Sequence, residues 1–271
     1  MNRALAAGLL VGLACVPPVA AEEPYGLPLT GEAAETFLRT AEVVRRRGLD
    51  QGITNSDQYT LSDGARTCRA IWKTIDEFKR GLSSFEGGGV YLDFADSWKH
   101  EVAAYELDKL VGTGLVPPTV ERTFGRKKGS LQLWVEGAMT EADRKKRTLA
   151  PPDPQRWNEQ MYQVRLLHQL TYNTDYRNIN NVLSDPSFRV YAVDFSRAFV
   201  SYGDLRSEQE LVRFSRSVLE ALKALDRPTL DARLGRWLTG PQIEGLLKRR
   251  DKILALAERR VREQGEAAVL Y

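Results

Sequence analysis

The polar segment at residues 172–181 constrains the fold more than any other part of the sequence. It ends a long helical pattern and contains Asp175 and, five residues later, Asn180. Two short β-prone stretches follow around the turn Ser184-Asp185-Pro186, and the second stretch ends at Asp194. Asparagine and aspartate favour turns, but turn chemistry requires neither this spacing nor the second aspartate. The pattern therefore indicates a pair of loops that carry chemistry.

The first half of the chain reads as strands, one helix and two further strands. The turn signal at residues 62–64 separates two β-prone stretches, the second of which ends at Lys73. Apolar spacing predicts a helix at residues 97–111, and Gly112 together with Gly114 ends that helix. Residues 116–124 and 130–135 then predict two strands joined by a basic turn.

After residue 137 the pattern becomes helical. Prolines precede a long helix whose apolar stripe runs from Trp157 to Leu170, and two more stripes cover residues 211–225 and 243–261. A β-rich half thus meets an α-rich half, and we expect an α+β chain. The expected divisions are a signal peptide at 1–21, an N-terminal extension at 22–48, a β-rich part at 49–137 and an α-rich part at 138–271.

The N-terminus has the features of a signal peptide. Arg3 precedes an apolar run, and small residues precede a cleavage point expected after Ala21. We therefore expect an exported protein, periplasmic or secreted, with no transmembrane segment in the mature chain, because no later stretch is continuously apolar. An uncleaved anchor is less favoured because the run is shorter than roughly 20 residues. Lipidation at Cys15 is also less favoured, because Gly12 stands where a larger apolar residue is expected.

Charge and cysteine content exclude some classes of function and stabilisation. The chain has 39 basic and 36 acidic side chains, and Arg3 is the one charged residue in the expected signal peptide. So balanced a charge gives no bias toward nucleic acid or another polyanion. If Cys15 leaves with the signal peptide, Cys68 is the remaining cysteine. The mature chain is then held by its core, without an internal disulfide.

Phosphoryl transfer from ATP needs a cation for the phosphates, ligands for a divalent metal and a carboxylate beside the acceptor. In this order of motifs, Asp175 would orient the acceptor hydroxyl, while Asn180 and Asp194 would bind Mg²⁺ or Mn²⁺. Each assignment follows from the spacing of the two loops.

The nucleotide would meet the first half of the chain. Lys73 closes an apolar strand, so its ammonium could reach phosphates while Ile71, on the same face, lines an adenine pocket. Glu101 lies on the following helix, in a place to pair with Lys73. Taken singly these residues also have ordinary structural readings, because edge strands commonly carry lysine.

These motifs resemble two groups of kinases: the phosphatidylinositol 3- and 4-kinases and the Golgi casein-type kinases of the secretory pathway. The similar runs are Asn173-Thr174-Asp175, Asn180, residues 193–199, Lys73, residues 101–108, residues 115–119 and residues 130–136. The resemblance covers about residues 50–200 and implies a two-lobed protein-kinase-like fold, with residues 49–137 as the N-lobe and residues 138–271 as the C-lobe. It also implies Lys73 on the phosphates, Glu101 as its partner, Glu136 near the adenine hinge, Asp175 as catalytic aspartate, and Asn180 and Asp194 as metal ligands.

The sequence departs from those families at two places. Tyr176 and Arg177 follow Asp175, where the families have arginine and histidine, and the phosphate loop expected between Gly52 and Ser56 holds one glycine. The leading hypothesis is an exported ATP-dependent kinase-like phosphotransferase acting on a protein, lipid or small polar acceptor. The alternatives are a pseudokinase or nucleotide-binding regulatory protein without turnover, and an exported structural protein that retains only the fold. No motif identifies the acceptor.

Overall fold

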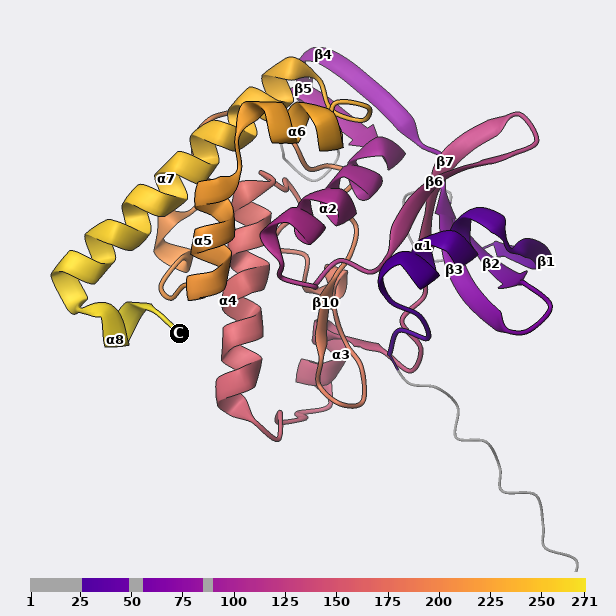
Figure 1. Ribbon diagram of the computed structural model, residues 1–271, viewed down its shortest axis with the longest axis horizontal. Coiled ribbons are helices and arrows are strands. Elements are labelled where there is room, and N and C mark those ends of the chain that lie inside the picture. Colours follow the sequence, from indigo (N-terminus) through magenta and orange to yellow (C-terminus); the bar gives the residue numbers. More distant parts are fainter. Residues whose placement is uncertain (1–25, 49–55, 85–89) are drawn as a thin grey trace, which may run out of the picture.

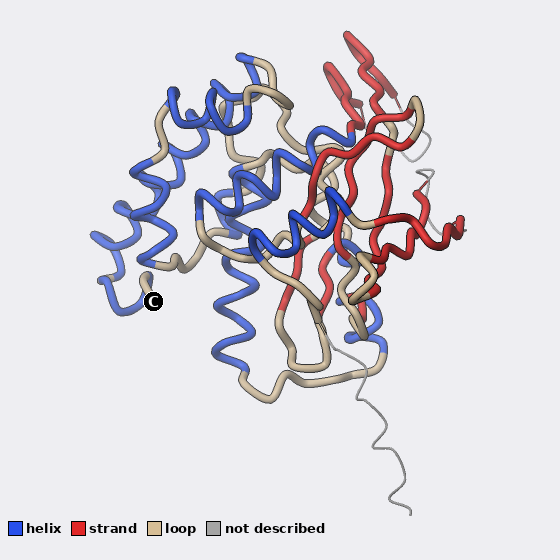
Figure 2. The backbone as a smooth tube through the Cα atoms, turned by 45° about the vertical axis from the view of Figure 1, so that its right-hand side comes forward, coloured by secondary structure: helices blue, strands red, loops and turns tan. Residues whose placement is uncertain are grey.

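The computed structural model describes residues 26–48, 56–84 and 90–271, and it places a β-rich part beside a helical part (Figure 1). Figure 2 shows most strands gathered on one side of the molecule and most helices on the other. We call these parts the N-lobe and the C-lobe. The predicted α+β arrangement of two lobes is confirmed. The expected signal peptide and Cys15 lie outside the described residues.

The N-lobe is built on one antiparallel sheet of five strands. In spatial order these are β1 (Glu42–Gly48), β2 (Ser56–Ser62), β3 (Thr67–Lys73), β7 (Lys127–Leu133) and β6 (Thr119–Phe124). The predicted hairpin joins β2 to β3, and its Asp63 carboxylate accepts hydrogen bonds from the backbone of Ala65 and Arg66. An aspartate at this position stabilises the turn because it satisfies backbone donors locally.

The two faces of the sheet have different environments. Side chains alternate along a strand, so Ala70 and Trp72 of β3 point to one face while Ile71 and Lys73 point to the other. The first face packs against α1 (Gly31–Thr40) and forms the apolar core of the N-lobe. The second face is therefore the one that is free to present Lys73 to the rest of the molecule.

Residues 31–48 form part of the N-lobe sheet layer. We expected residues 22–48 to be an extension preceding the lobe, but α1 covers the sheet and β1 is its edge strand, paired with β2. The strand was missed because it carries Arg45-Arg46-Arg47 and lacks apolar alternation. Charged residues are tolerated on an edge strand, where they also discourage pairing with another chain.

The helix predicted at residues 97–111 is α2 (Trp98–Val111). The Ser97 side chain accepts a hydrogen bond from the Lys99 amide at 3.2 Å, and Gly112 ends the helix with a left-handed φ of 77°. Eleven residues of α2 are buried, among them the carboxylate-bearing Glu101. The helix is therefore enclosed between the sheet and the C-lobe.

A hairpin that the sequence did not predict leads from β3 into α2. It consists of β4 (Asp76–Ser84) and β5 (Val90–Ser97), which pair antiparallel. Where the hairpin begins and ends, the Trp98 amide donates to the Ile75 carbonyl at 2.7 Å. The hairpin thus returns the chain so that the first turn of α2 starts close to the end of β3.

The C-lobe carries most of the helices. They are α3 (Glu141–Lys146), α4 (Pro154–Leu170), α5 (Arg216–Ala224), α6 (Arg227–Leu234), α7 (Gly240–Gln264) and α8 (Glu266–Val269). Two short 3-10 turns, η1 (Ile179–Asn181) and η2 (Glu208–Glu210), lie in the connections. The long helices predicted from the apolar stripes are confirmed as α4 and α7. The stripe at residues 211–225 is helical from Arg216 onward, and α6 was not predicted.

A small sheet in the C-lobe positions the polar segment described above. Its strands are β8 (Met139–Thr140), β9 (Val182–Ser184) and β10 (Val190–Ala192), in the order β10-β9-β8. The predicted pair around Ser184-Asp185-Pro186 is confirmed as β9 and β10. Residues 171–181, before β9, carry the aspartate expected beside the acceptor, and we call them the catalytic loop. Residues 193–199, after β10, carry the aspartate expected to bind the metal, and we call them the metal loop. Because β9 and β10 pair, the two loops lie side by side.

The core of the C-lobe extends into α2. Leu107 of α2 belongs to the same apolar cluster as Leu167 of α4, Leu222 of α5 and Leu246 of α7, and Phe195 of the metal loop lies in it as well. Burial of this apolar surface fixes α2 against the C-lobe. The helix that carries Glu101 is thereby held in place from both lobes.

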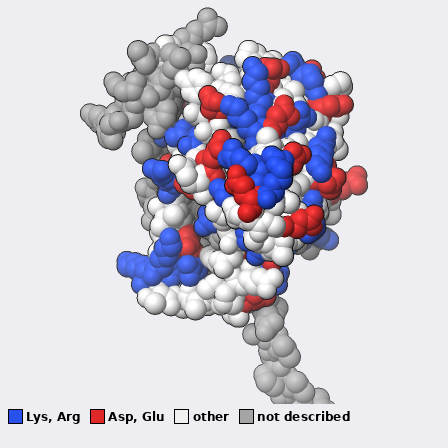
Figure 3. Space-filling view, turned by 90° about the vertical axis from the view of Figure 1, so that its left-hand side faces the viewer, with Lys and Arg blue, Asp and Glu red and all other residues white. Residues whose placement is uncertain are grey.

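The surface and the single described cysteine add two constraints. Figure 3 shows basic and acidic side chains interspersed on the side where α7 lies. Exposed ion pairs such as Arg227–Asp231 occur among the described residues. None of the helices in the described ranges combines the length and the apolar character that spanning a membrane requires. Cys68 is a buried free thiol, and burial raises its pKa.

Candidate active site

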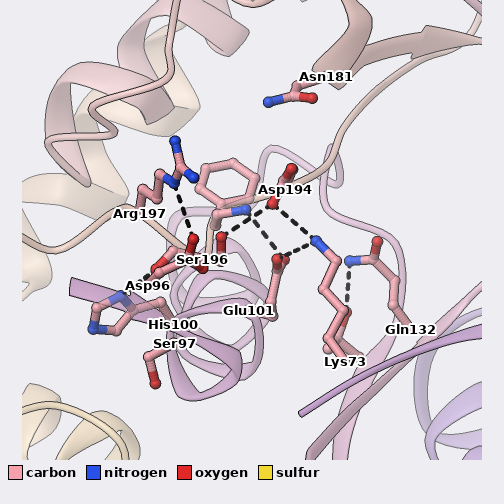
Figure 4. A network of polar contacts seen from close by, with 12 residues as sticks. Lys73, Asp96, Ser97, His100, Glu101, Gln132, Asn181, Asp194, Ser196 and Arg197 are labelled. Carbon is pink, nitrogen blue, oxygen red and sulfur yellow. Dashed lines mark hydrogen bonds and ion pairs between the residues drawn. The ribbon is translucent and has the colours of Figure 1, made fainter. Parts of the chain in front are cut away.

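One ammonium group joins three parts of the fold. Lys73 Nζ, at the end of β3, lies 2.6 Å from Glu101 Oε1 in the first turn of α2 and 2.8 Å from Asp194 Oδ1 in the metal loop (Figure 4). The side chain of Glu101 is 2% exposed, whereas that of Asp194 is 34% exposed. We call these residues the charged triad. It brings together three of the residues selected from the sequence.

The charges of the triad depend on burial and on mutual attraction. Burial lowers the pKa of Lys73, but Glu101 and Asp194 outweigh that effect and hold it above its ordinary value. Burial also opposes ionisation of Asp194, yet attraction to Lys73 keeps the Asp194 pKa below its ordinary value. For Glu101 burial prevails over the attraction of Lys73 and raises the pKa. At neutral pH Lys73 is charged and Asp194 is ionised.

The metal loop is held beneath the triad by backbone contacts. The Phe195 amide donates to Glu101 Oε2 at 3.1 Å, and the Phe195 ring is fully buried against His168. The Ser196 carbonyl lies 2.8 Å from His100 Nδ1, so this nitrogen must carry the proton. Burial lowers the pKa of His100 to about 4, which keeps the ring neutral.

Asp194 itself has a left-handed backbone, with φ of 62°. This conformation is unfavourable for a residue other than glycine, and it persists where surrounding contacts determine it. Here those contacts are the Lys73 ion pair, the Ser196 hydroxyl at 3.2 Å and the neighbouring Phe195 amide bond to Glu101. The loop is therefore shaped so that a carboxylate faces Lys73.

Asp175 lies in the catalytic loop and is held by amides. Its backbone N–H donates to Asn173 Oδ1 at 2.9 Å, and its Oδ2 accepts from Asn178 Nδ2 and Asn181 Nδ2, each at 3.0 Å. Asn173 is fully buried. No basic side chain in the described part of the chain is hydrogen-bonded to Asp175. The carboxylate is oriented by neutral donors and remains partly accessible.

The structure separates the two neighbouring asparagines of η1. Asn180, expected as a metal ligand, is exposed, and its amide donates to Asn178 Oδ1 at 3.2 Å. Asn181 is buried, bonds to Asp175 and lies across from the Asp194 carboxylate in Figure 4. Its carbonyl also accepts from the Val193 amide at 2.9 Å, next to Asp194. The geometry therefore favours Asn181 over Asn180 as a candidate metal ligand. The sequence signal that could have selected Asn181 is its place directly before the apolar strand β9.

The two loops are tied to each other by several further bonds. The Phe199 amide donates to the Thr171 carbonyl at 2.6 Å, and the Thr174 hydroxyl donates to the Arg197 carbonyl at 3.1 Å. The Arg197 side chain in turn pairs with the buried Asp96 at 3.0 Å. These contacts place the residue proposed for the acceptor and the residue proposed for the metal in one connected unit.

Of the two residues expected on the adenine side, Ile71 lies on the face of the sheet that carries Lys73, and Glu136 does not contact Lys73. Ile71 is opposite Gln132 of β7 and Gln58 of β2, on the same face of the sheet as Lys73. Glu136 is turned elsewhere: its carboxylate pairs with Arg69, and its backbone exchanges bonds of 2.7 and 2.8 Å with Gly26. Its polar groups thus tie the connection between the lobes to the sheet.

The loop expected to cover the phosphates, between Gly52 and Ser56, lies largely outside the described residues. Ser56 begins β2 and is opposite Lys73 in the register of β2 and β3. The expected loop therefore directly precedes the strand beside Lys73.

No family model matches this chain, and no curated protein matches it. Solved structures do match. The structure of hydra Fam20 with sugar gives a TM-score of 0.63 at 15% identity, covering 88% of this chain and 90% of that one. The crystal structure of the golgi casein kinase gives 0.63 at 16% identity, covering 88% and 78%.

A bacterial kinase is also similar. The Helicobacter pylori proinflammatory kinase CtkA gives a TM-score of 0.51 at 11% identity, covering 84% of this chain and 98% of that one. At these identities the likeness shows the fold. The chain has the two-lobed kinase fold, and the resemblance to Golgi casein-type kinases is confirmed at the level of the fold.

Proposed function

We propose that this protein is an exported ATP-dependent kinase-like phosphotransferase that acts on a hydroxyl of a protein, lipid or small polar acceptor. The observation that supports this most is the convergence of Lys73, Glu101 and Asp194 beside the loop that carries Asp175. Lys73 would bind the phosphates of the nucleotide, and Glu101 would hold the Lys73 ammonium in place. Ile71 would line the adenine pocket, with Glu136 stabilising the nearby connection through Arg69.

The donor set suits a hard divalent cation. Asp194 and Asn181 offer carboxylate and amide oxygens, which Mg²⁺ and Mn²⁺ prefer. The described residues contain no cluster of three His, Cys, Asp or Glu that could hold a metal. Two protein ligands are nevertheless adequate for Mg²⁺, because substrate phosphates and water commonly complete its coordination. When bound, the ion neutralises charge on the phosphates. In this proposal Asn181 replaces Asn180.

Asp175 would orient the acceptor hydroxyl and accept its proton. Its amide partners Asn178 and Asn181 fix the direction of the carboxylate without neutralising it. Positioning of this kind supplies a large part of the catalysis of phosphoryl transfer, because the protein forms no covalent bond to the phosphate.

A pseudokinase or nucleotide-binding regulatory protein is the second candidate. It is favoured by Tyr176 and Arg177, which stand where related motifs have arginine and histidine. Such a protein would bind nucleotide through the same triad without turning it over.

Thermal unfolding with ATP and either Mg²⁺ or Mn²⁺ tests both candidates. A nucleotide at 100 times its dissociation constant should add roughly 2.7 kcal/mol to the free energy of unfolding. Absence of any stabilisation at millimolar nucleotide would refute both. Stabilisation together with Asp175-dependent phosphate transfer supports the first candidate, and stabilisation without transfer or ADP formation supports the second. N-terminal mass analysis of exported protein tests the expected start after Ala21, which a retained Met1 would contradict.

A further inference from the structure

Arg249, in the middle of α7, carries a buried charge that the proposed chemistry does not use. The residue has no exposed surface. Among the described residues, no carboxylate lies within ion-pair distance of its guanidinium, in contrast to the many arginines of this chain that do form ion pairs. Burial accordingly lowers the pKa of Arg249 to about 9. A buried cation without a counter-ion is costly, so its contacts require an explanation.

Those contacts are backbone carbonyls on both sides of the candidate site. Arg249 Nε donates to the Leu170 carbonyl at 2.8 Å, and one terminal nitrogen donates to the carbonyls of Val200, at 3.0 Å, and Tyr202. Leu170 directly precedes the catalytic loop, and Val200 directly follows the metal loop. The Arg249 side chain thus bonds the residue that precedes the catalytic loop and the residue that follows the metal loop.

The bonded carbonyls flank two strained residues. Tyr172 has φ of 48° and Phe199 has φ of 59°, and both are left-handed conformations that non-glycine residues rarely adopt. Such residues persist where the surroundings determine the backbone. Arg249 bonds the chain two residues before Tyr172 and one residue after Phe199. The Arg249 guanidinium also lies 5.6 Å from the centre of the Tyr172 ring.

One turn before Arg249, α7 has a glycine, Gly245, where the helix passes close to the chain that follows the metal loop. A Cβ on Gly245 would lie 2.5 Å from the Ser201 carbonyl oxygen, so a larger residue would push the chain after the metal loop away from the helix. Gly245 therefore permits the close approach that lets Arg249 reach Val200 and Tyr202.

We propose that Arg249 is a positioning residue for phosphoryl transfer, holding the catalytic loop and the metal loop in register through their flanking carbonyls. The inference rests on the proposed function. Arg249 touches neither nucleotide nor acceptor, and it acts through the alignment of Asp175 with Asp194. Because misplacement by about 1 Å can cost about 10²-fold in rate, loss of this clamp should lower turnover more than binding.

The test compares Arg249→Lys with Arg250→Lys in the full-length mature protein. The control residue is adjacent on α7 but bonds the Leu225 carbonyl and Asp251, away from both loops. For Arg249→Lys we expect kcat to fall by about 10 to 100-fold, the KM for ATP to stay within about threefold, and one nucleotide still to bind per chain. Hydrogen exchange should quicken at residues 171–175 and 198–203. The control should match the wild type in each measurement.

Gly245→Ala provides a second variant that keeps the Arg249 charge. It should show the same separation of kcat from KM, because it displaces the backbone that Arg249 binds. The inference is overturned if both variants transfer phosphate as fast as the control, or if kcat falls only in proportion to the fraction of chains that bind nucleotide, since that would indicate a folding role alone. A wild-type protein that binds nucleotide but transfers no phosphate would instead reject the proposed function.

Discussion

The nucleotide side and the acceptor side of the candidate site are held together by different interactions. On the nucleotide side, Lys73 is bound to Glu101 and Asp194 by ion pairs of 2.6 and 2.8 Å. On the acceptor side, Asp175 Oδ2 accepts hydrogen bonds from the neutral side-chain amides of Asn178 and Asn181, each at 3.0 Å. The ion pairs of Lys73 therefore depend on a balance of charges in a buried environment. The amide hydrogen bonds of Asp175 instead fix the direction in which its carboxylate points.

This difference predicts how substitutions on each side will affect nucleotide binding and phosphate transfer. Removing one member of a buried ion pair leaves an uncompensated charge, so changes on the nucleotide side affect structure and binding together. Changing the proton-accepting power of Asp175 leaves its neutral neighbours satisfied, so binding survives while chemistry is lost. The following variants test that distinction.

The largest effect is expected for Asp194→Ala. It removes the carboxylate that would join the metal to the phosphates, so metal-dependent ATP binding should be lost in a calorimetric titration. Asp204→Ala is the control, because Asp204 is an exposed aspartate paired with Lys252 outside the site. Equal ATP affinity in Asp194→Ala and the wild type would contradict the assignment.

A purely catalytic loss is expected for Asp175→Asn. The amide keeps the size of the carboxylate, so ATP affinity should stay within a few fold, while transfer falls by about 10² to 10⁴ because the proton acceptor is gone. The measurement is a phosphate-transfer assay alongside a binding titration. Asp231→Asn, at an exposed residue paired with Arg227, should leave both unchanged. Undiminished transfer in Asp175→Asn would remove Asp175 from the mechanism.

The two asparagines of η1 should differ in their effect on the metal. Asn181→Ala should raise the Mg²⁺ concentration required for half-maximal stabilisation by ATP by about tenfold, the order of loss seen when a metal site loses a supporting group. Asn180→Ala should change it less than twofold, because Asn180 is exposed and bonded to Asn178. The opposite ranking would return the metal role to Asn180.

The last prediction concerns the dependence of stability on pH, because a buried neutral histidine lies next to each side of the site. His100 donates to the Ser196 carbonyl, and His168 Nδ1 lies 3.3 Å from the Asn173 amide. Burial lowers the pKa of both from 6.5 to about 4. Between those pH values the unfolded chain binds protons that the folded chain does not, so stability falls as pH falls, by about 2 kcal/mol per histidine at pH 5.

His168→Gln tests this pH dependence. Glutamine does not titrate, so urea unfolding between pH 7.5 and 5 should show a loss of stability smaller by about 2 kcal/mol than in the wild type. An unchanged loss would show that His168 does not contribute to acid destabilisation.

Local signals were adequate where neighbours along the chain decide the structure. The glycine after Val111 and the turn at residues 62–64 each satisfy backbone groups within a few residues, and both were predicted correctly. The Ser97 side chain likewise caps α2 locally, although the cap itself was not predicted. Strand β1 was missed because its three arginines are acceptable only at the edge of a sheet, and that position depends on pairing with β2. The β4–β5 hairpin and α6 were missed as well, although Pro228 in the first turn of α6 was a visible helix-start signal.

The sequence by itself determined the α+β class and selected Lys73, Glu101, Asp175 and Asp194, because residue spacing and helix and strand periodicity are local properties of the chain. The two-lobed fold was implied by the resemblance of these motifs to known kinases. The tertiary structure decided which groups meet. Lys73 and Asp194 are 121 residues apart, and their contact depends on α2 being held by both lobes. A 3-10 turn buries Asn181 and exposes Asn180, which spacing cannot distinguish. Likewise, the bonds of Arg249 to carbonyls carry no sequence signal, because every residue has a carbonyl.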